Sequence, residues 1–362
     1  MIPALAIVHG LSLALCVGVQ PARVFTWSDE PSMTGMTGEI VKADAQGVHL
    51  RVESSPIPTV IAWYRVRQIE PPPPQPGAFS RIAEDAWRAH TRLARGDHAG
   101  ALRVYESMRD AYLWQIGPQS MDVAIGLKRC LLNRGQRLRA IEPAVAWYVS
   151  AGADAGKAAQ DFSDIDPRMM LHIDLPPIAG SGPRTGLPFA LPQLPNLTDR
   201  ERLLFLYYRL VSDGPDRAEA HLTQIEDLKR LMRSRDPGLV LMEQMVFAQA
   251  HPDAAKRNAG FNALRRRTKT QADTWVEVWA RLAMGASLLS DPDATRREQG
   301  VIELLHVVVR LHSVDPNLTM LAAQTAAAYL DATERGHLSA QILHDARTKI
   351  TEAMASPTRG RE

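Results

Sequence analysis

The spacing of apolar residues changes once along the chain. Between residues 23 and 70, apolar and polar side chains alternate; in the stretch GEIVKADAQGVHLRV, Val48, Leu50 and Val52 fall on one side and polar residues on the other. A period of two is typical of half-buried β-strands, and residues 45–47 between two such runs predict a tight turn. We therefore expect four or five short strands that form a small β-barrel over residues 23–70.

From residue 78 onward the apolar residues recur every three or four positions, which is typical of amphipathic helices. Turn signals rich in Asp, Pro and Gly divide this region into helices that follow one another in pairs. The predicted pairs are 80–95 with 98–111, 120–133 with 137–150, 200–210 with 218–232, 239–250 with 254–266, 272–289 with 295–312, and 318–333 with 338–354. The predicted fold class is multidomain α+β and mainly α, with the small N-terminal barrel followed by helical repeats over residues 78–160 and 198–355.

Two proline-rich segments separate these modules. Residues 71–77 contain the run PPPPQP, which we interpret as a stiff linker, with a recognition site for a partner's aromatic groove as the alternative. Residues 161–197 hold seven prolines and several apolar residues. We expect this segment to pack on the helices as an extended strap; a lid or groove filler and a disordered loop are the alternatives.

The first predicted helix pair resembles a tetratricopeptide repeat. Its second half, GDHAGALRVYESM, places Gly96 at the turn, Ala101 at the small position and Tyr105 at the aromatic position of that family's second helix. The first helix departs from the family pattern, because Asp85 and Arg88 stand where an aromatic residue and Leu are expected. The resemblance implies an α-solenoid of degenerate repeats, whose exposed groove holds a peptide or protein partner.

The β-rich segment is similar to the small SH3-like or Sm-like barrels found near the N-termini of exported bacterial proteins. The matching residues are Gly38, Ile40, Asp44, Gly47, Val48, Leu50, Trp63, Val66 and Ile69. Barrels of this size bind peptides, RNA or no ligand, so the resemblance implies a fold and no particular function.

The N-terminus carries a long apolar run. Residues 2–19 contain no Asp, Glu, Lys or Arg, so residues 1–22 are typical of a secretory signal peptide or an N-terminal anchor. A lipoprotein signal at Cys16 and a buried helix of the folded protein are the alternatives. We expect an exported protein, in the periplasm or cell envelope, which contacts a membrane only if this segment is not cleaved. Residues 356–362 form a polar tail.

Composition excludes some classes of protein without indicating a function. The 362 residues include 42 Lys and Arg against 40 Asp and Glu, 45% hydrophobic residues and 2 Cys, which excludes a disordered, collagen-like or disulfide-stapled protein. A net charge of +2 gives no reason to expect nucleic acid as a partner. If Cys16 leaves with a signal peptide, Cys130 is the remaining cysteine, and we expect its thiol to be buried in a helix.

The sequence carries few features typical of catalytic or metal-binding sites. The sequence contains no GxxxxGK[ST] loop, no HExxH and no serine nucleophile elbow, and the Asp residues around His172 lack the spacing of a calcium loop. We therefore predict no catalytic residue, no cofactor and no metal. The most distinctive charged feature is Arg265, Arg266, Arg267 and Lys269, a weak candidate for partner binding; the alternative is the solvated end of a helix.

These patterns favour an exported, non-enzymatic interaction or scaffold protein that binds a peptide or protein partner along its helical-repeat surface. Two other functions stay open. One is a ligand-binding protein or enzyme whose site lies under residues 161–197, and the other is a membrane-anchored scaffold.

Overall fold

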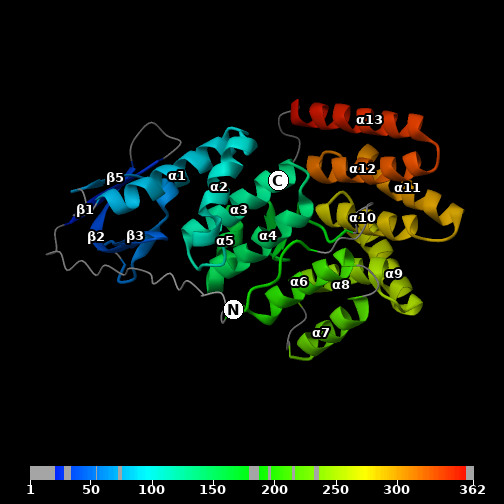
Figure 1. Ribbon diagram of the computed structural model, residues 1–362, viewed down its shortest axis with the longest axis horizontal. Helices are drawn as coiled ribbons and strands as arrows, with labels where there is room; N and C mark the ends of the chain where they lie inside the picture. Colours follow the sequence, from blue (N-terminus) through cyan, green and yellow to red (C-terminus); the bar gives the residue numbers. More distant parts are fainter. Residues whose placement is uncertain are drawn as a thin grey trace, which may run out of the picture. The chain divides into compact units, whose positions relative to one another are not determined.

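Figure 1 shows the computed structural model, which describes residues 21–27, 34–53, 55–71, 76–178, 187–194, 197–213, 217–231 and 236–355. These residues form a mainly α-helical protein with a β-sheet in its N-terminal part, as predicted. The chain divides into two compact units, one made of residues 1–130 and 149–152 and the other of residues 131–148 and 153–362. Nearly all of the predicted signal peptide, most of the linker and the polar tail lie outside the described residues. No helix in the described ranges is both long and apolar enough to cross a membrane.

The first unit begins with a five-stranded antiparallel sheet. The strands are β1 Ala22–Thr26, β2 Thr34–Asp44, β3 Gly47–Arg51, β4 Thr59–Ile61 and β5 Val66–Glu70, in the order β4-β3-β2-β1-β5. The predicted turn joins β2 to β3, where Asp44 pairs with Gly47. Gly47 has a φ of 145°, and a Cβ there would collide with the carbonyl oxygen of Ile61, so the turn requires glycine. Val48 and Leu50, predicted to share a face, are both fully buried.

The prediction of a barrel is wrong, because the sheet is not closed. Strands β4 and β5 are its two edges and do not pair with each other along their described lengths. Between them the chain forms a 3-10 helix, η1 Trp63–Arg65, against which α1 Pro76–Ala94 packs. The buried indole of Trp63 donates a hydrogen bond to the carbonyl oxygen of Asp44, at 2.8 Å. The short β4 ends at this tethered turn, and the chain then enters β5 at the opposite edge of the sheet.

Three helices follow the sheet in the chain: α1, α2 His98–Tyr112 and α3 Pro118–Asn133. Gly96 makes the turn before α2 with a φ of 78°, and the side chain of Asp97 caps the first turn of that helix. Ala101 and Tyr105 are fully buried. The ring of Tyr105 occupies the space beside Gly126 of α3, where any Cβ would collide with it. The positions predicted to be small and aromatic are therefore packing positions.

The second unit is helical for most of its length. Its elements are α4 Arg137–Ala151, whose last three residues belong to the first unit, η2 Gly152–Asp154, whose first residue does too, α5 Ala155–Ala158, η3 Ala159–Asp161, α6 Asp199–Ser212, α7 Ala218–Leu231, α8 Pro237–Ala250, α9 Ala254–Thr270, α10 Trp275–Leu289, α11 Ala294–Arg310, α12 Pro316–Ala332 and α13 Gly336–Ala355. From α6 onward, consecutive helices pack in pairs: α6 with α7, α8 with α9, α10 with α11 and α12 with α13. The predicted helical segments are confirmed, with ends that differ from the prediction by a few residues.

Aspartate side chains explain where several of these helices begin. Asp236, Asp253, Asp293 and Asp315 each accept a hydrogen bond from a backbone N–H in the first turn of α8, α9, α11 and α12, respectively. Proline follows the capping residue in α8 and α12, where its missing N–H removes no helical hydrogen bond. Two of the Asp-Pro turn signals in the sequence, at residues 236–237 and 315–316, are therefore helix starts.

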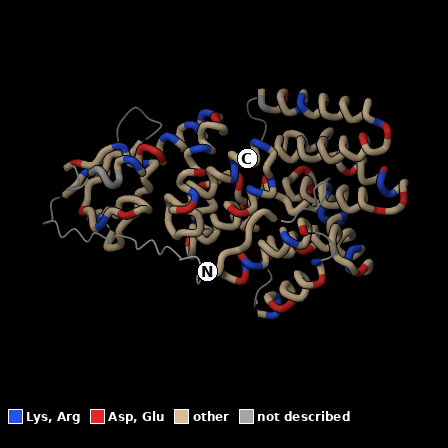
Figure 2. The backbone as a smooth tube through the Cα atoms, in the orientation of Figure 1, with Lys and Arg blue, Asp and Glu red and all other residues tan. Residues whose placement is uncertain are grey.

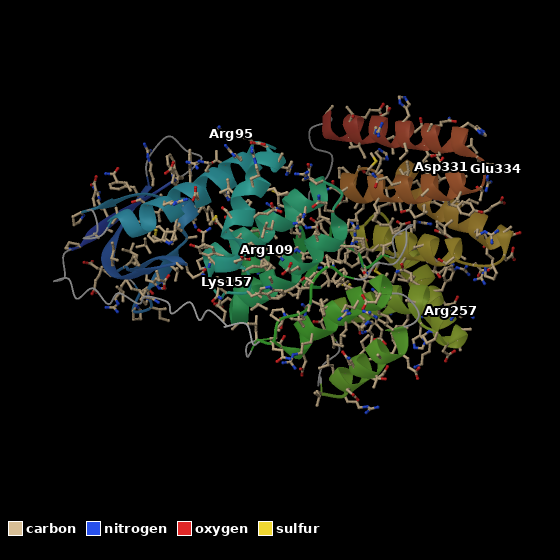
Figure 3. The ribbon with its side chains drawn as sticks, in the orientation of Figure 1. Arg95, Arg109, Lys157, Arg257, Asp331 and Glu334 are labelled. Atoms are coloured by element: carbon tan, nitrogen blue, oxygen red, sulfur yellow. The ribbon has the colours of Figure 1, made fainter. Side chains whose placement is uncertain are left out.

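Helices α9 and α11 are two copies of one pattern. They begin at residues 254 and 294 and end at residues 270 and 310, so both ends are offset by 40 residues. Arg257, labelled in Figure 3, and Arg297 each donate hydrogen bonds to two carbonyl groups of the turn before their helix. Gly260 and Gly300 lie where each helix crosses the backbone of its partner helix. The two copies therefore begin, cross and end in the same way.

Candidate functional site

An extended segment crosses the helices of the second unit. Residues 165–178, which we call the strap, contain the short strands β6 Ile165–Asp166 and β7 Leu171–His172 and then continue without regular structure. Leu171, Leu175 and the two prolines that follow Leu175 are buried. A buried segment outside helices and sheets has backbone carbonyl groups that need hydrogen-bond donors from elsewhere.

Side chains from four helices supply these donors. Tyr208 of α6 donates its hydroxyl to the carbonyl oxygen of Leu175 at 2.6 Å, and Trp279 of α10 donates its indole N–H to that of Ile173 at 2.7 Å. Further hydrogen bonds to strap carbonyl groups come from Arg137 and Tyr148 of α4, Arg200 of α6 and Gln249 of α8. The strap, which is part of the protein's own chain, therefore covers one surface of α4, α6, α8 and α10.

Two half-buried ionisable groups lie close to the strap. Burial lowers the pKa of the Arg137 guanidinium, which donates to the carbonyl groups of Asp174 and Pro176. Burial also raises the pKa of the Asp315 carboxyl to about 6; the nearby Asp174 adds to the increase, and backbone N–H groups of α12 oppose it. Arg137 holds the strap and Asp315 caps α12, so the structure gives both groups a role in the fold.

A cavity of about 690 Å³ lies between α7 and α9. Leu203 and Tyr207 of α6 and Leu239, Val240 and Phe247 of α8 form its floor, and Lys256, Ala259, Gly260 and Ala263 form its α9 wall. The cavity exists because α7 packs chiefly on α6, whereas α9 packs on α10 and α11 packs on α12. Figure 1 shows α7 at the lower edge of these helices. Lys256 and Ala259 are exposed, so the cavity opens to solvent, and we call it the α7–α9 groove.

On the α7 side, the charges of the groove are already paired. Lys229 Nζ lies 2.8 Å from Glu243 Oε1 and 3.6 Å from Glu226 Oε1. Burial alone would lower the pKa of Lys229, but the two glutamates outweigh it and raise the pKa. Asp236 Oδ2 likewise lies 2.7 Å from Arg200 Nε. The carboxylates that line the groove are therefore neutralised within the protein.

The structure separates the four basic residues that the sequence grouped together. Successive residues of a helix are rotated by about 100°, so neighbours in the sequence face different ways. Arg265, Arg266 and Lys269 are exposed and do not line the groove. The guanidinium of Arg265 lies over the ring of Phe261, 5.2 Å from its centroid.

Arg267 differs from the other three. It follows Ala263 by one helical turn and therefore lies on the groove side of α9. Its Nε donates to the Oε1 of Gln244, a groove residue of α8, at 2.6 Å. The side chain is half-buried, and this burial lowers the pKa of the guanidinium. Of the four predicted residues, Arg267 alone donates a hydrogen bond to a residue that lines the groove.

Other chemistry-bearing residues have structural partners. His90 Nδ1 lies 2.9 Å from Asp122 Oδ1, and His172, in the middle of the acidic stretch noted in the sequence, lies with its Nε2 3.0 Å from the carbonyl oxygen of Ala144. Burial raises the pKa of the Cys130 thiol to about 12, which keeps it protonated and weakly nucleophilic. Within the described ranges, no group of three or more His, Cys, Asp or Glu is placed to hold a metal ion.

Comparison with known proteins adds no relative: no family model, no curated protein and no solved structure matches the chain. Sequence reasoning missed the groove residues of α7 and α8, above all Lys229, Glu243 and Gln244. A signal for the α9 wall was present, because residues 254–270 contain six Lys and Arg and no Asp or Glu. Figure 2 marks these charges on the backbone.

Proposed function

We propose that this chain is a non-enzymatic interaction or scaffold protein that binds a peptide or protein partner through its helical unit. The α7–α9 groove is the observation that carries the proposal, because it combines an apolar floor with an opening to solvent. Such a groove buries the apolar side chains of a bound segment and leaves its polar side chains hydrated. The partner segment lies between α7 and α9. Another surface of the helical unit, formed by α4, α6, α8 and α10, is already covered by the strap.

The helical pairs support a relationship to degenerate tetratricopeptide repeats. Ala101 and Tyr105, at the small and aromatic positions of that family, are buried. In two later pairs, Gly260 and Gly300 stand where the helices cross. The final helix, α13, exposes mostly polar residues, as terminal elements of solenoids do. Repeats of this kind present grooves to partner segments, which agrees with the proposed function.

Export to the periplasm or cell envelope is also part of the proposal, and it rests on the apolar run of residues 2–19. The N-terminal module, similar to SH3-like domains, is an open sheet in which β1 pairs with both β2 and β5. A scaffold protein would have such a second folded module in addition to its helical repeats.

A ligand site under the strap, residues 165–178, gains no support from the contacts there. A separate cavity of about 910 Å³ lies between residues 190–194 and helices α6 and α7. The polar groups beneath the strap, such as Tyr208 and Trp279, already donate to its carbonyl groups. A ligand in that place would have to displace the strap and replace each of these hydrogen bonds.

Site-specific photocrosslinking tests the proposal. A photoreactive amino acid placed at Ala263, in the groove wall, should give a discrete covalent adduct with a second protein in cells that produce the full chain. The same amino acid at Gln341, on the exposed surface of α13, is the matched control and should give none. No adduct at Ala263, or the same adducts at both positions, would refute the groove as the interaction surface.

A further inference from the structure

We infer that the segment bound in the α7–α9 groove is acidic, with one carboxylate paired to Arg267 and another close to Lys256. The inference rests on the proposed function and specifies the chemistry of the partner. Three observations carry it: the charge of α9, the position of Arg267, and the contrast with the next helix pair.

The charge of α9 is unbalanced. Its 17 residues include six Lys and Arg and no Asp or Glu, although the whole chain has 42 basic and 40 acidic residues. None of the six forms an ion pair with any residue in the described part of the chain. The α7 wall opposite contributes Lys229, which is paired to glutamates. The positive charge left at the groove attracts an anionic segment and disfavours a cationic one.

Arg267 of α9 corresponds to a buried valine, Val307, in α11. The offset of 40 residues between α9 and α11 aligns Leu264 with Leu304 and Arg267 with Val307. Leu264, Leu304 and Val307 are fully buried, whereas Arg267 is half-buried beside a neutral carboxamide, that of Gln244. A guanidinium that loses water without gaining a carboxylate is destabilising. Packing alone favours an apolar residue here, so the arginine indicates a role in binding.

The next helix pair contains a guanidinium that is paired with carboxylates. Arg281 of α10 is mostly buried and lies 2.8 Å from Glu277 Oε1 and 2.6 Å from Glu303 Oε2. The residue of α9 that corresponds to Glu303 is Ala263, which lines the groove. Ala263 leaves space in α9 at the position where α11 has the carboxylate of Glu303. A carboxylate of the partner would fill this space and pair with Arg267.

The dimensions of the groove suit a short segment of protein. Its α8 floor runs from Asp236 to Phe247, which corresponds to about 16 Å along a helix. That length accommodates about three helical turns or about five residues of extended chain. Leu239, Val240 and Phe247 provide apolar contacts along the floor, so an acidic segment with interspersed apolar side chains is the occupant that matches both charge and surface.

Peptide binding to the full chain tests the inference. The probe is a synthetic peptide of about twelve residues, with leucines at helical spacing and glutamates between them. Two matched peptides carry glutamine or lysine in place of glutamate. In fluorescence anisotropy, the glutamate peptide should bind at least about tenfold more tightly than the glutamine peptide, and this preference should shrink as salt is raised. The lysine peptide should bind most weakly.

Three variants separate a binding role of Arg267 from a structural one. Arg267→Val should weaken binding of the glutamate peptide about tenfold and leave the urea midpoint of unfolding unchanged or higher, because α11 has valine there. Arg267→Glu should abolish the preference for glutamate over glutamine. Arg265→Glu changes the net charge by the same amount as Arg267→Glu, at an exposed residue that lies over Phe261 and is rotated by about 200° from Arg267 around α9. It should weaken binding less than about twofold.

These experiments distinguish a failure of the acidic specificity from a failure of the proposed function. Equal affinity for the glutamate and glutamine peptides would overturn the acidic specificity while keeping the groove as a binding surface. Failure of every peptide to bind would also overturn the inference, and crosslinking at Ala263 decides the proposed function independently. A lower urea midpoint for Arg267→Val, or an equal loss of affinity in Arg265→Glu, would contradict the role assigned to Arg267.

Discussion

Removing one hydroxyl group tests whether the strap is held by side chains of the helices. In Tyr208→Phe, the phenol that donates to the carbonyl oxygen of Leu175 at 2.6 Å is replaced by a ring of the same shape. Both residues are buried, and burial raises the pKa of Tyr208 far above its usual value, so the hydroxyl is a neutral donor. The substitution leaves the apolar packing in place and removes the described donor to that carbonyl group.

The expected loss follows from the burial of that carbonyl group. Leu175 is 1% exposed, so water has little access to its backbone. Leaving a buried acceptor without its donor costs about 1–3 kcal/mol, whereas losing a solvent-exposed hydrogen bond costs little. We expect Tyr208→Phe to lower the free energy of unfolding by about 2 kcal/mol and to increase hydrogen exchange in residues 165–178.

Urea titration followed by tryptophan fluorescence measures the first effect, and hydrogen exchange with mass spectrometry measures the second. Tyr329→Phe is the matched control, because the hydroxyl of Tyr329 in α12 makes no hydrogen bond to the described residues. It should change the free energy of unfolding by less than about 0.5 kcal/mol. If Tyr208→Phe and Tyr329→Phe are indistinguishable in stability and exchange, the strap is not anchored in the way that the contacts indicate.

The remaining predictions concern packing, pH and export. A Cβ at Gly260 would lie 2.9 Å from two backbone atoms of α8, so Gly260→Ala should lower the urea midpoint, whereas Gly156→Ala, with open space around it, should raise or preserve it. Ala101→Leu should lower the free energy of unfolding by about 1–3 kcal/mol, and an unchanged midpoint would show that the site tolerates the added volume. Burial raises the pKa of Asp315 from 3.8 to about 6, so the folded protein binds this proton more tightly than the unfolded chain does. The protonated carboxyl therefore stabilises the fold fully below pH 3.8, and this stabilisation is lost as the pH rises through 6. The stability of Asp315→Asn relative to the unmodified protein should therefore increase between pH 4 and pH 7, by up to about 3 kcal/mol, and a difference independent of pH would contradict this. Residues 1–30 should export a reporter that is active only outside the cytoplasm, and a silent but expressed fusion would refute the export proposal.

Local sequence patterns predicted the parts of the fold that depend on neighbouring residues. Alternation around Val48 and Leu50 predicted the β2–β3 hairpin, because the strand period and the glycine turn are local properties. The helices were predictable for the same reason, since Asp caps such as Asp253 and Asp293 mark their first turns. Closure of the sheet was predicted wrongly, because it depends on whether two edge strands meet, and no local pattern specifies that contact.

The candidate site depended on contacts that are distant in the sequence. Trp279 donates to Ile173 across 106 residues, so the alternation of apolar and polar residues carries no sign of this anchor. The groove arises because α7 does not close onto α8 and α9, which is a property of tertiary packing. The different directions of Arg267 and Arg265 follow from helical geometry, because residues two positions apart differ by about 200°. The contact of Arg267 with Gln244 depends on tertiary packing and was not predictable from the spacing along α9.

Hydrogen exchange of the full chain with and without the glutamate peptide tests the central claim most directly, because it locates the bound segment without assuming where it lies. Binding between α7 and α9 predicts slower exchange in residues 218–231 and 254–270, with no change in the strap at residues 165–178. The account would be contradicted if protection appeared in the strap and in the helices beneath it, or if the peptide bound without slowing exchange in either α7 or α9.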